Sequence, residues 1–501
     1  MPLLFPSSYS LICNKLQRFR TFKRKSLKMK NVLFLLWGMC LIMHANGQKA
    51  MGYYNSANIK NENQDYIGAI NDYNRAIEAD PKFEKAYYNR GVARYALKDY
   101  AGSIADDTKA IELNPKYDIA YCNRGNAKNT IHDYSGAVDD LSKCIQLNPG
   151  IERAWFNRGI AENNLSRYND AIADFNKAIS LDDKDALAYF NRGISENKIK
   201  DYEGAIADYN RTIELSPAYG LAYGNRGNTR SNLLDYKGAI ADYNKAIELN
   251  PGDEQAYNNR GNAKLKMQDI KGAVADFNMS IELKPDYERP YYNRGILKTQ
   301  LQDYKSAIAD FSKAAELNPD DEQVFLNRGI AYNSLRDLDA AMTDFNTTIR
   351  LNPRNELAWS DRGTLKSSLQ NDTGALADFN TAIALNPTYY MAYSNRGAAK
   401  DATGDFEGAI VDYSRAIELN PRYEKAYFNR GFTKSKIKDY SGAIADYRKA
   451  IELNPKYAKA YTGRGKARRL SGDKDGACSD YKKAQELGDP KASDAIKEFC
   501  N

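Results

Sequence analysis

Residues that could carry out catalysis are scarce in this chain. Histidine, the commonest general base and a frequent metal ligand, occurs only at His44 and His132. The sequence has no glycine-rich phosphate loop, and Gly463-Arg464-Gly465 lacks the third glycine of a dinucleotide-binding fingerprint. Carboxylates are plentiful, but they recur at fixed intervals, which is typical of structure rather than of one site. We therefore expect no catalytic residue, no metal and no cofactor.

The charged residues with the most regular spacing are an arginine and an aspartate sixteen residues apart, and the pair recurs every 34 residues. If the chain folds back midway between them, the two side chains lie level on antiparallel helices. Losing one partner of a buried ion pair costs about 3 to 5 kcal/mol, so such pairs specify register. A ligand-binding role for the arginines is the alternative. Representative structural pairs are Arg90 with Asp106, Arg192 with Asp208, and Arg430 with Asp446.

This spacing belongs to a repeat that occupies most of the chain. In 34-residue frames from Ala50, the same residue types fall in the same columns thirteen times, ending at Lys491. Column 4 is always aromatic, column 8 is Gly in twelve frames, column 24 is mostly aromatic, and column 32 is Pro in eleven. The apolar spacing predicts two helices per frame, with Asp at column 16 capping the second and Asn-Pro ending it. One such hairpin cannot bury its apolar face, so we expect thirteen to stack.

These columns resemble the tetratricopeptide repeat, which has an aromatic residue at 4, Gly at 8, Ala at 20, an aromatic at 24, Ala at 27 and Pro at 32. The resemblance implies an all-α, right-handed superhelical solenoid of helix-turn-helix hairpins, of the exported bacterial type. It covers residues 50–491, after an N-terminal extension and signal peptide at 1–47 and before a capping helix at 492–501. Column 7 departs from the family, because it is Arg in twelve frames where Leu is usual.

In this family the first helix of each hairpin lines a concave groove, which implies that columns 2, 5, 6, 9, 12 and 13 face a partner. Column 6 is Asn in eleven frames, with Asp361 and Gly463 as exceptions. An Asn amide offers both a donor and an acceptor and could hold a peptide backbone, although bonds within the protein compete for it. Column 5 varies, and its rings could stack on a ligand. The predicted groove residues are Asn55, Asn89, Asn123, Asn157, Asn191, Asn225, Asn259, Asn293, Asn327, Asn395 and Asn429, with Tyr88, Phe156, Phe190, Tyr292 and Phe428.

Four cysteines follow residue 47, an even number that favours disulfides in an exported protein over buried free thiols. Cys478 and Cys500 lie eleven residues on either side of the turn near residue 489, so they should be level and should link the last helix to the final repeat. Cys122 and Cys144 flank His132 by ten and twelve residues, which predicts a second bridge.

The N-terminal segment is expected to direct export. Lys28 and Lys30 precede the apolar run Val32 to Met43, and Ala45 and Gly47 are small, which predicts cleavage before Gln48. Twelve apolar residues are too few for a membrane span of roughly 20. Met29 would make a more usual start for such a signal peptide than Met1.

Charge gives no reason to expect nucleic acid as a partner. The whole chain has a formal net charge of +7, but residues 1–47 hold eight basic and no acidic residues. The remainder has 64 basic against 65 acidic residues, so no general attraction to polyanions follows. We expect a non-catalytic adaptor that binds a protein or extended peptide in the groove. The alternative is a structural solenoid of the cell envelope that assembles with its own copies.

Overall fold

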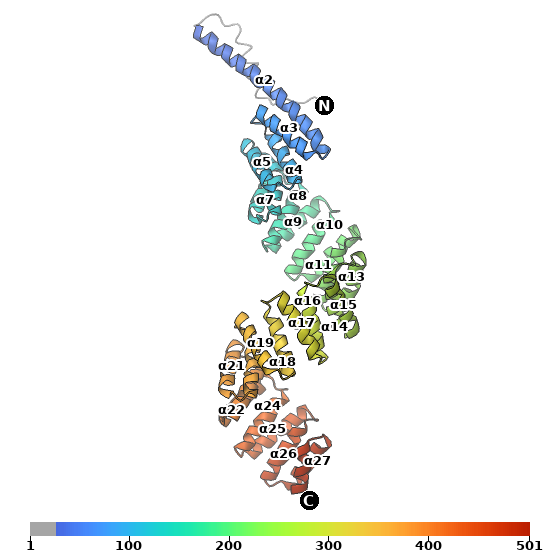
Figure 1. The fold of residues 1–501 in the computed structure, drawn as a ribbon, viewed down its shortest axis with the longest axis vertical. Coiled ribbons are helices and arrows are strands. Elements are labelled where there is room, and N and C mark those ends of the chain that lie inside the picture. The colour runs from blue at the N-terminus through green and yellow to red at the C-terminus, as the bar shows by residue number, and fades with distance from the viewer. Residues whose placement is uncertain (1–26, 501) are drawn as a thin grey trace. The chain divides into compact units, whose positions relative to one another are not determined.

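The computed structural model describes residues 27–500, in which every regular element is an α-helix (Figure 1). The chain forms two units, divided after Pro251, and each is described by itself. The N-terminal unit has six hairpins: α2 (Leu27–Glu62) with α3 (Tyr66–Ala79), α4 (Glu84–Ala96) with α5 (Tyr100–Leu113), α6 (Asp118–Thr130) with α7 (Tyr134–Leu147), α8 (Glu152–Asn164) with α9 (Tyr168–Leu181), α10 (Ala186–Lys198) with α11 (Tyr202–Leu215), and α12 (Gly220–Asn232) with α13 (Tyr236–Leu249).

The C-terminal unit has seven hairpins and a last helix. Its elements are α14 (Glu254–Lys266) with α15 (Ile270–Leu283), α16 (Glu288–Gln300) with α17 (Tyr304–Leu317), α18 (Glu322–Ser334) with α19 (Leu338–Leu351), α20 (Glu356–Ser368) with α21 (Asp372–Leu385), α22 (Tyr390–Ala402) with α23 (Phe406–Leu419), α24 (Glu424–Lys436) with α25 (Tyr440–Leu453), α26 (Ala458–Leu470) with α27 (Lys474–Glu486), and α28 (Pro490–Phe499). We call the first helix of each hairpin helix A and the second helix B. The predicted fold of stacked helical hairpins is confirmed.

Local sequence sets the ends of the helices. Asp99 precedes α5, and its Oδ1 accepts a hydrogen bond from the backbone N–H of Gly102 at 2.9 Å, which satisfies one of the free donors of the first turn. At the other end of this helix, the side chain of Asn114 accepts from the backbone N–H of Lys116 at 3.1 Å. The turn between helices A and B places column 15 in the left-handed region, as at Lys98 with φ of 64°.

The core of most hairpins depends on a glycine on helix A that faces an aromatic ring on helix B. A Cβ atom added at Gly159 would lie 2.8 Å from Cε1 of Phe175, whose side chain is fully buried. The same close approach recurs between Gly193 and Tyr209. Glycine at column 8 therefore lets the two helices come near enough for the ring of column 24 to fill the space between them.

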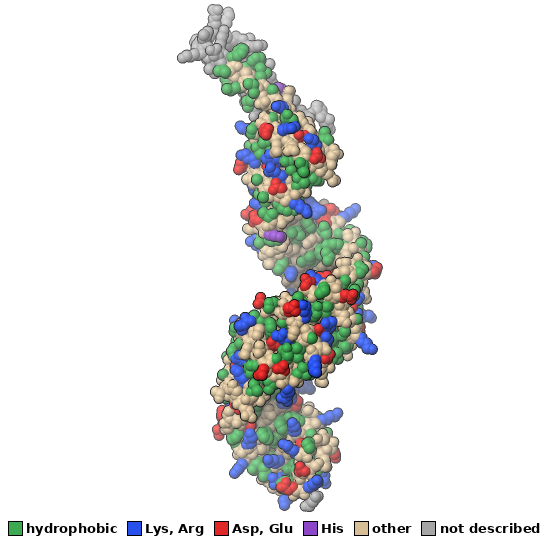
Figure 2. Space-filling view, viewed as in Figure 1, with side chains coloured by type: hydrophobic (Ala, Val, Ile, Leu, Met, Phe, Trp, Pro, Cys, Tyr) green, Lys and Arg blue, Asp and Glu red, His purple; other side chains and the backbone are tan. Residues whose placement is uncertain are grey.

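Helix α2 runs without interruption through the predicted cleavage site before Gln48. Its apolar side chains near the start are exposed, as with Phe34 at 76% and Ile42 at 63%, and Figure 2 shows hydrophobic side chains gathered there. Ala50 is the first buried residue of this helix among those whose side chains are described. Most of the predicted extension and the basic residues before 27 lie outside the described residues. Across residues 27–500, none of the helices combines the length and the apolar character that a bilayer crossing needs.

Candidate functional site

The recurring arginines hold the hairpins together. Nε and Nη2 of Arg192 donate to the two carboxylate oxygens of Asp208 at 2.7 and 2.6 Å, and the Asp208 side chain is buried. Nη1 of Arg192 donates to the side chain of Asn176 in the preceding hairpin at 2.5 Å. Arg192 therefore links the two helices of its own hairpin and also ties that hairpin to the preceding one.

The predicted ion pairs all have this geometry. The Nη2 to Oδ1 distance is 2.5 Å for Arg90 with Asp106 and 2.6 Å for Arg430 with Asp446. Twelve hairpins contain the pair, and in the first hairpin Ser56 donates to Asp72 at 2.7 Å instead. The guanidinium of Arg90 also lies 5.4 Å from the ring centroid of Tyr87 at column 4. With its donors and its face both in contact within the protein, this arginine has a structural role.

The contact to the preceding hairpin was not predicted from the sequence. Nη1 of Arg90 donates to Asn74, Nη1 of Arg124 donates to Thr108 at 3.0 Å, and Nη1 of Arg158 donates to Ser142 at 3.0 Å. These Asn, Thr and Ser partners all lie at column 25. That column is Asn, Ser or Thr in the first eleven frames, a pattern that could have revealed the contact.

The column 6 asparagines use their amide donors mostly within the protein. Asn191 donates to the carbonyl of Leu187 at 2.8 Å, four residues earlier on its own helix. Asn293 donates instead to the side chain of Asn258 in the preceding hairpin at 2.9 Å. The remaining bonds of this kind are Asn89 to Asn58 and Tyr54, Asn123 to Asp107, Asn225 to Leu221, Asn327 to Gln323 and Tyr292, and Asn395 to Thr364.

The other members of the column are placed as follows. The side-chain oxygen of Asn259 accepts from Asn258 at 3.1 Å, and the backbone carbonyl of Asn157 accepts from Asn129 at 2.9 Å. Asn429 is half-buried and Asn55 is exposed. These bonds favour the interpretation in which the asparagines of this column bond within their own helix or to the neighbouring hairpin. Where one N–H of the amide is engaged in this way, the second N–H and the side-chain carbonyl oxygen are left for a partner.

The aromatic residues of column 5 pack against other rings of the stack, and their stacking on a ligand stays a prediction. Phe156 and Phe190 are only 9% and 7% exposed. The ring of Phe190 lies 5.0 Å from Tyr219 and 5.9 Å from Tyr209. The side chain fills the space between its own helix B and the next hairpin, where burial of a ring is most favourable.

The three remaining column 5 rings make the same kind of contact. The centroid distances are 5.3 Å from Tyr88 to Tyr117, 6.0 Å from Tyr292 to Phe311 and 4.9 Å from Phe428 to Tyr457. These rings are half-buried, so packing of the hairpins explains their presence.

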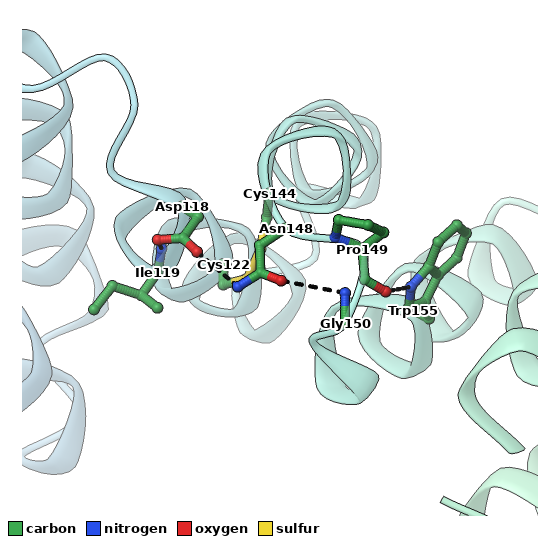
Figure 3. The surroundings of a disulfide bond; sticks show 8 residues. All are labelled: Asp118, Ile119, Cys122, Cys144, Asn148, Pro149, Gly150 and Trp155. Atoms are coloured by element: carbon green, nitrogen blue, oxygen red, sulfur yellow. Dashed lines mark hydrogen bonds between the residues drawn. A yellow bond between two sulfur atoms is a disulfide. The ribbon is translucent and has the colours of Figure 1, made fainter. Parts of the chain in front are cut away.

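Both predicted cysteine pairs are joined. Cys122 on α6 is bonded to Cys144 on α7, with the Cα atoms 5.4 Å apart (Figure 3). Nearby, the Asn148 side chain donates to Asp118 at 3.0 Å and so fastens the end of α7 to the start of α6. Cys478 on α27 is bonded to Cys500, which directly follows α28, at a Cα distance of 5.6 Å. This bridge ties the last helix to the final hairpin.

A buried aspartate replaces the column 24 ring in the second hairpin. Asp107 on α5 is completely buried, and its Oδ2 accepts from Asn123 Nδ2 at 2.7 Å. Its Oδ1 has no hydrogen-bond partner among the described residues. Burial is the main cause that raises the pKa of Asp107 to about 8. Asp107 interrupts a column that is Tyr, Phe or Leu in the other frames, and this break is the sequence signal that could have identified it.

The described residues contain no group of three or more His, Cys, Asp or Glu placed to hold a metal ion. Each hairpin instead presents the surface of its helix A, and this surface recurs from one hairpin to the next.

Models of this repeat match the chain along much of its length. A model described as "Tetratricopeptide repeat" matches residues 152–185, 289–321 and 424–457, and a second with that description matches 84–117, 186–219, 254–287 and 322–355. A "TPR repeat" model matches 57–98, 235–268 and 402–438. Together these matches cover more than half of the chain. The chain therefore belongs to the tetratricopeptide repeat family.

Several solved structures are similar to the chain. The Cut9 and Hcn1 hetero-tetramer of APC/C is 15% identical, with 92% of this chain and 98% of that chain covered and a TM-score of 0.44. Yeast Tom70 is 19% identical over 89% of this chain and 93% of its own, with a TM-score of 0.38. A tetratricopeptide repeat protein from Parabacteroides merdae is 21% identical over 50% of this chain and 99% of its own, with a TM-score of 0.42. No curated protein matches the chain in sequence.

Proposed function

We propose that this protein is a non-catalytic adaptor of the cell envelope that binds a protein or an extended peptide on the helix A faces of its hairpins. The observation that carries the proposal is at column 2, on the first turn of helix A. Six frames have a large apolar residue there that is substantially exposed: Met51, Ile119, Leu187, Leu221, Leu357 and Met391. Leu221 is 56% exposed.

Exposed apolar residues on one repeated face are typical of a surface that binds another protein. Single exposed leucines are ordinary, but these recur at one column. In the same hairpins, columns 4, 7, 8, 23 and 24 hold the fold together. The frame is therefore constant, and the exposed face varies from one hairpin to the next, which suits selective binding by a solenoid.

Export is the second part of the proposal. In α2, the described side chains from Phe34 to Lys49 are not buried, and packing begins at Ala50. Cleavage before Gln48 would thus leave the first hairpin intact. The two disulfides also suit an oxidising compartment. N-terminal sequencing of the exported protein should begin at Gln48, and a retained Met1 or Met29 would contradict this part.

Binding can be tested with a charge placed on the face. The variant Leu187→Glu/Leu221→Glu puts two carboxylates on helices α10 and α12, where both native side chains are exposed and packing is little changed. Partner capture from envelope extracts should fall at least tenfold, which corresponds to about 1.4 kcal/mol, with an unchanged thermal melt. The matched control is Lys237→Glu on the exposed side of α13, which should bind normally. Undiminished capture by the double variant would contradict the proposal.

Sedimentation separates this proposal from self-assembly. An adaptor sediments as one copy, whereas a solenoid that assembles with itself would form larger species that the double variant disperses.

A further inference from the structure

In the C-terminal unit, the helix A faces of α20 and α22 carry an aspartate in place of the usual column 6 asparagine and a pocket beside two alanines. Leu357, Asp361 and Thr364 on α20 are spaced by four and three residues and so share one face of that helix. Met391, Asn395 and Ala398 occupy the same columns on α22. Leu357 is 42% exposed and Met391 is 36% exposed, so the face presents apolar surface to solvent.

A pocket of about 350 Å³ opens between these two helices. Thr364 and Ser367 line it from α20, Asn395, Ala398 and Ala402 line it from α22, and Phe379 of α21 contributes its ring. The Asn395 amide donates to the Thr364 hydroxyl at 3.3 Å across this space. This volume is large enough to hold one apolar side chain of a ligand.

The pocket exists because two columns carry alanine. On the next helix A, α24, the residues at the same columns are Phe432 and Lys436, and the Lys436 ammonium lies 4.9 Å from the Phe432 ring centroid. Large side chains therefore occupy these columns in the neighbouring hairpin, and Ala398 and Ala402 leave them open.

Asp361 breaks the asparagine column on the same face. Among the residues that the structure describes, no side chain forms a hydrogen bond or ion pair with its carboxylate. The aspartates of column 23 contrast with it, since Asp344 and Asp378, in the hairpins α18/α19 and α20/α21, are each paired with an arginine. Burial raises the pKa of Asp361 to about 6. A carboxyl group that is partly removed from water and has no cation gains from any cation brought to it.

We propose that this face of α20 and α22 binds an extended peptide segment that places an apolar side chain in the pocket and a lysine or arginine against Asp361. This inference rests on the proposed function and names the chemistry of its partner. Asp361 lies one helical turn from Thr364 at the pocket wall, about 5 Å along the axis. In an extended peptide this separation corresponds to roughly two residues, so the basic and apolar residues should be close in sequence.

The test uses the purified full chain and an array of immobilised ten-residue peptides of mixed sequence. Two variants substitute residues that other hairpins carry at the same columns, so both should fold. Asp361→Asn restores the common column 6 residue, and Ala398→Phe introduces the ring found at Phe432. The matched control is Glu407→Gln, which removes an exposed carboxylate from the outer side of α23.

The unmodified protein and the control should retain peptides that combine Lys or Arg with Leu, Met or Phe. Asp361→Asn should lower the affinity for these peptides at least tenfold and abolish the preference for a basic residue, because a charge-assisted bond is lost. Ala398→Phe should abolish the preference for the apolar residue. The inference would be overturned if the unmodified protein bound peptides without preferring a basic residue. It would also be overturned if Asp361→Asn bound the same peptides as tightly as the unmodified protein.

The outcomes distinguish this inference from the proposed function. If partner capture still depends on Leu187 and Leu221 but the two variants behave as the unmodified protein, only the inference fails. If the array retains no peptide and the Leu187→Glu/Leu221→Glu variant captures the partner undiminished, both the inference and the proposed function fail.

Discussion

The buried carboxyl group of Asp107 should make the second hairpin less stable at high pH. Its pKa is about 8 in the folded protein, and the ordinary value is 3.8. The folded state therefore binds the proton more tightly than the unfolded state. The favourable contribution is complete below about pH 4 and is lost as the pH rises towards about 8. At about 1.36 kcal/mol per pKa unit, the loss by pH 7 is on the order of 4 kcal/mol.

Replacing Asp107 with Phe should remove this dependence. Phe occupies the same column at Phe175, where it is fully buried over Gly159. Asn123 would lose its bond to Asp107, but its amide can turn to its own helix as that of Asn191 does. The variant should therefore gain the burial of a ring, and its advantage over the native protein should grow from about pH 4 to about pH 8.

Hydrogen exchange followed by mass spectrometry measures this locally, which suits a repeat protein whose hairpins open separately. Protection of α5 and α6 should fall with rising pH in the native protein, after correction for intrinsic exchange, and should stay level in Asp107→Phe. The matched control is Phe175→Tyr, since Tyr fills this column at Tyr209. A native protein whose α5 protection does not change with pH would refute the reasoning.

Three further predictions concern the frame of the repeat. Leu234 has a φ of 64° in the turn before α13, so Leu234→Gly should stabilise the hairpin by about 1 kcal/mol in denaturant unfolding, while Gly404→Ala should destabilise its own turn. Arg328→Met leaves the buried Asp344 without its only ion-pair partner among the described residues and should cost about 3 to 5 kcal/mol, most of which Arg328→Met/Asp344→Leu should restore in the same melts. Intact mass of non-reduced, alkylated protein should show no free thiol at Cys478 or Cys500, and reduction should increase hydrogen exchange in α28 without affecting α20.

Much of the fold could be predicted because one environment recurs thirteen times. The glycine of column 8 and the ring of column 24 identify two helices in close contact, and the sixteen-residue spacing of Arg192 and Asp208 places them level across the hairpin. These features depend on backbone geometry, which a period of 34 residues fixes. The caps at Asp99 and Asn114 follow from the same local chemistry.

The candidate site was harder to predict because side-chain orientation depends on the neighbouring hairpin. Phe190 is one of the predicted groove residues, and its ring also packs beside Tyr219, a contact that the sequence pattern did not indicate. Asn191 and Asn293 share a column, yet one bonds to its own helix and the other to Asn258. Asp361 and Asp107 interrupt their columns, and only their burial in the structure shows that both carboxyl groups have a raised pKa.

Site-specific photo-crosslinking in living cells tests the central claim most directly. A photoreactive phenylalanine analogue at Leu221 or Leu357, both exposed on helix A, should form an adduct with another protein. The same analogue at Lys237, which is exposed on helix B, should form none. Mass spectrometry of the adduct then identifies the bound chain. Adducts at Lys237 but not at Leu221 or Leu357 would contradict binding on the helix A faces, and adducts only with a second copy of this chain would replace the adaptor with a self-assembling solenoid.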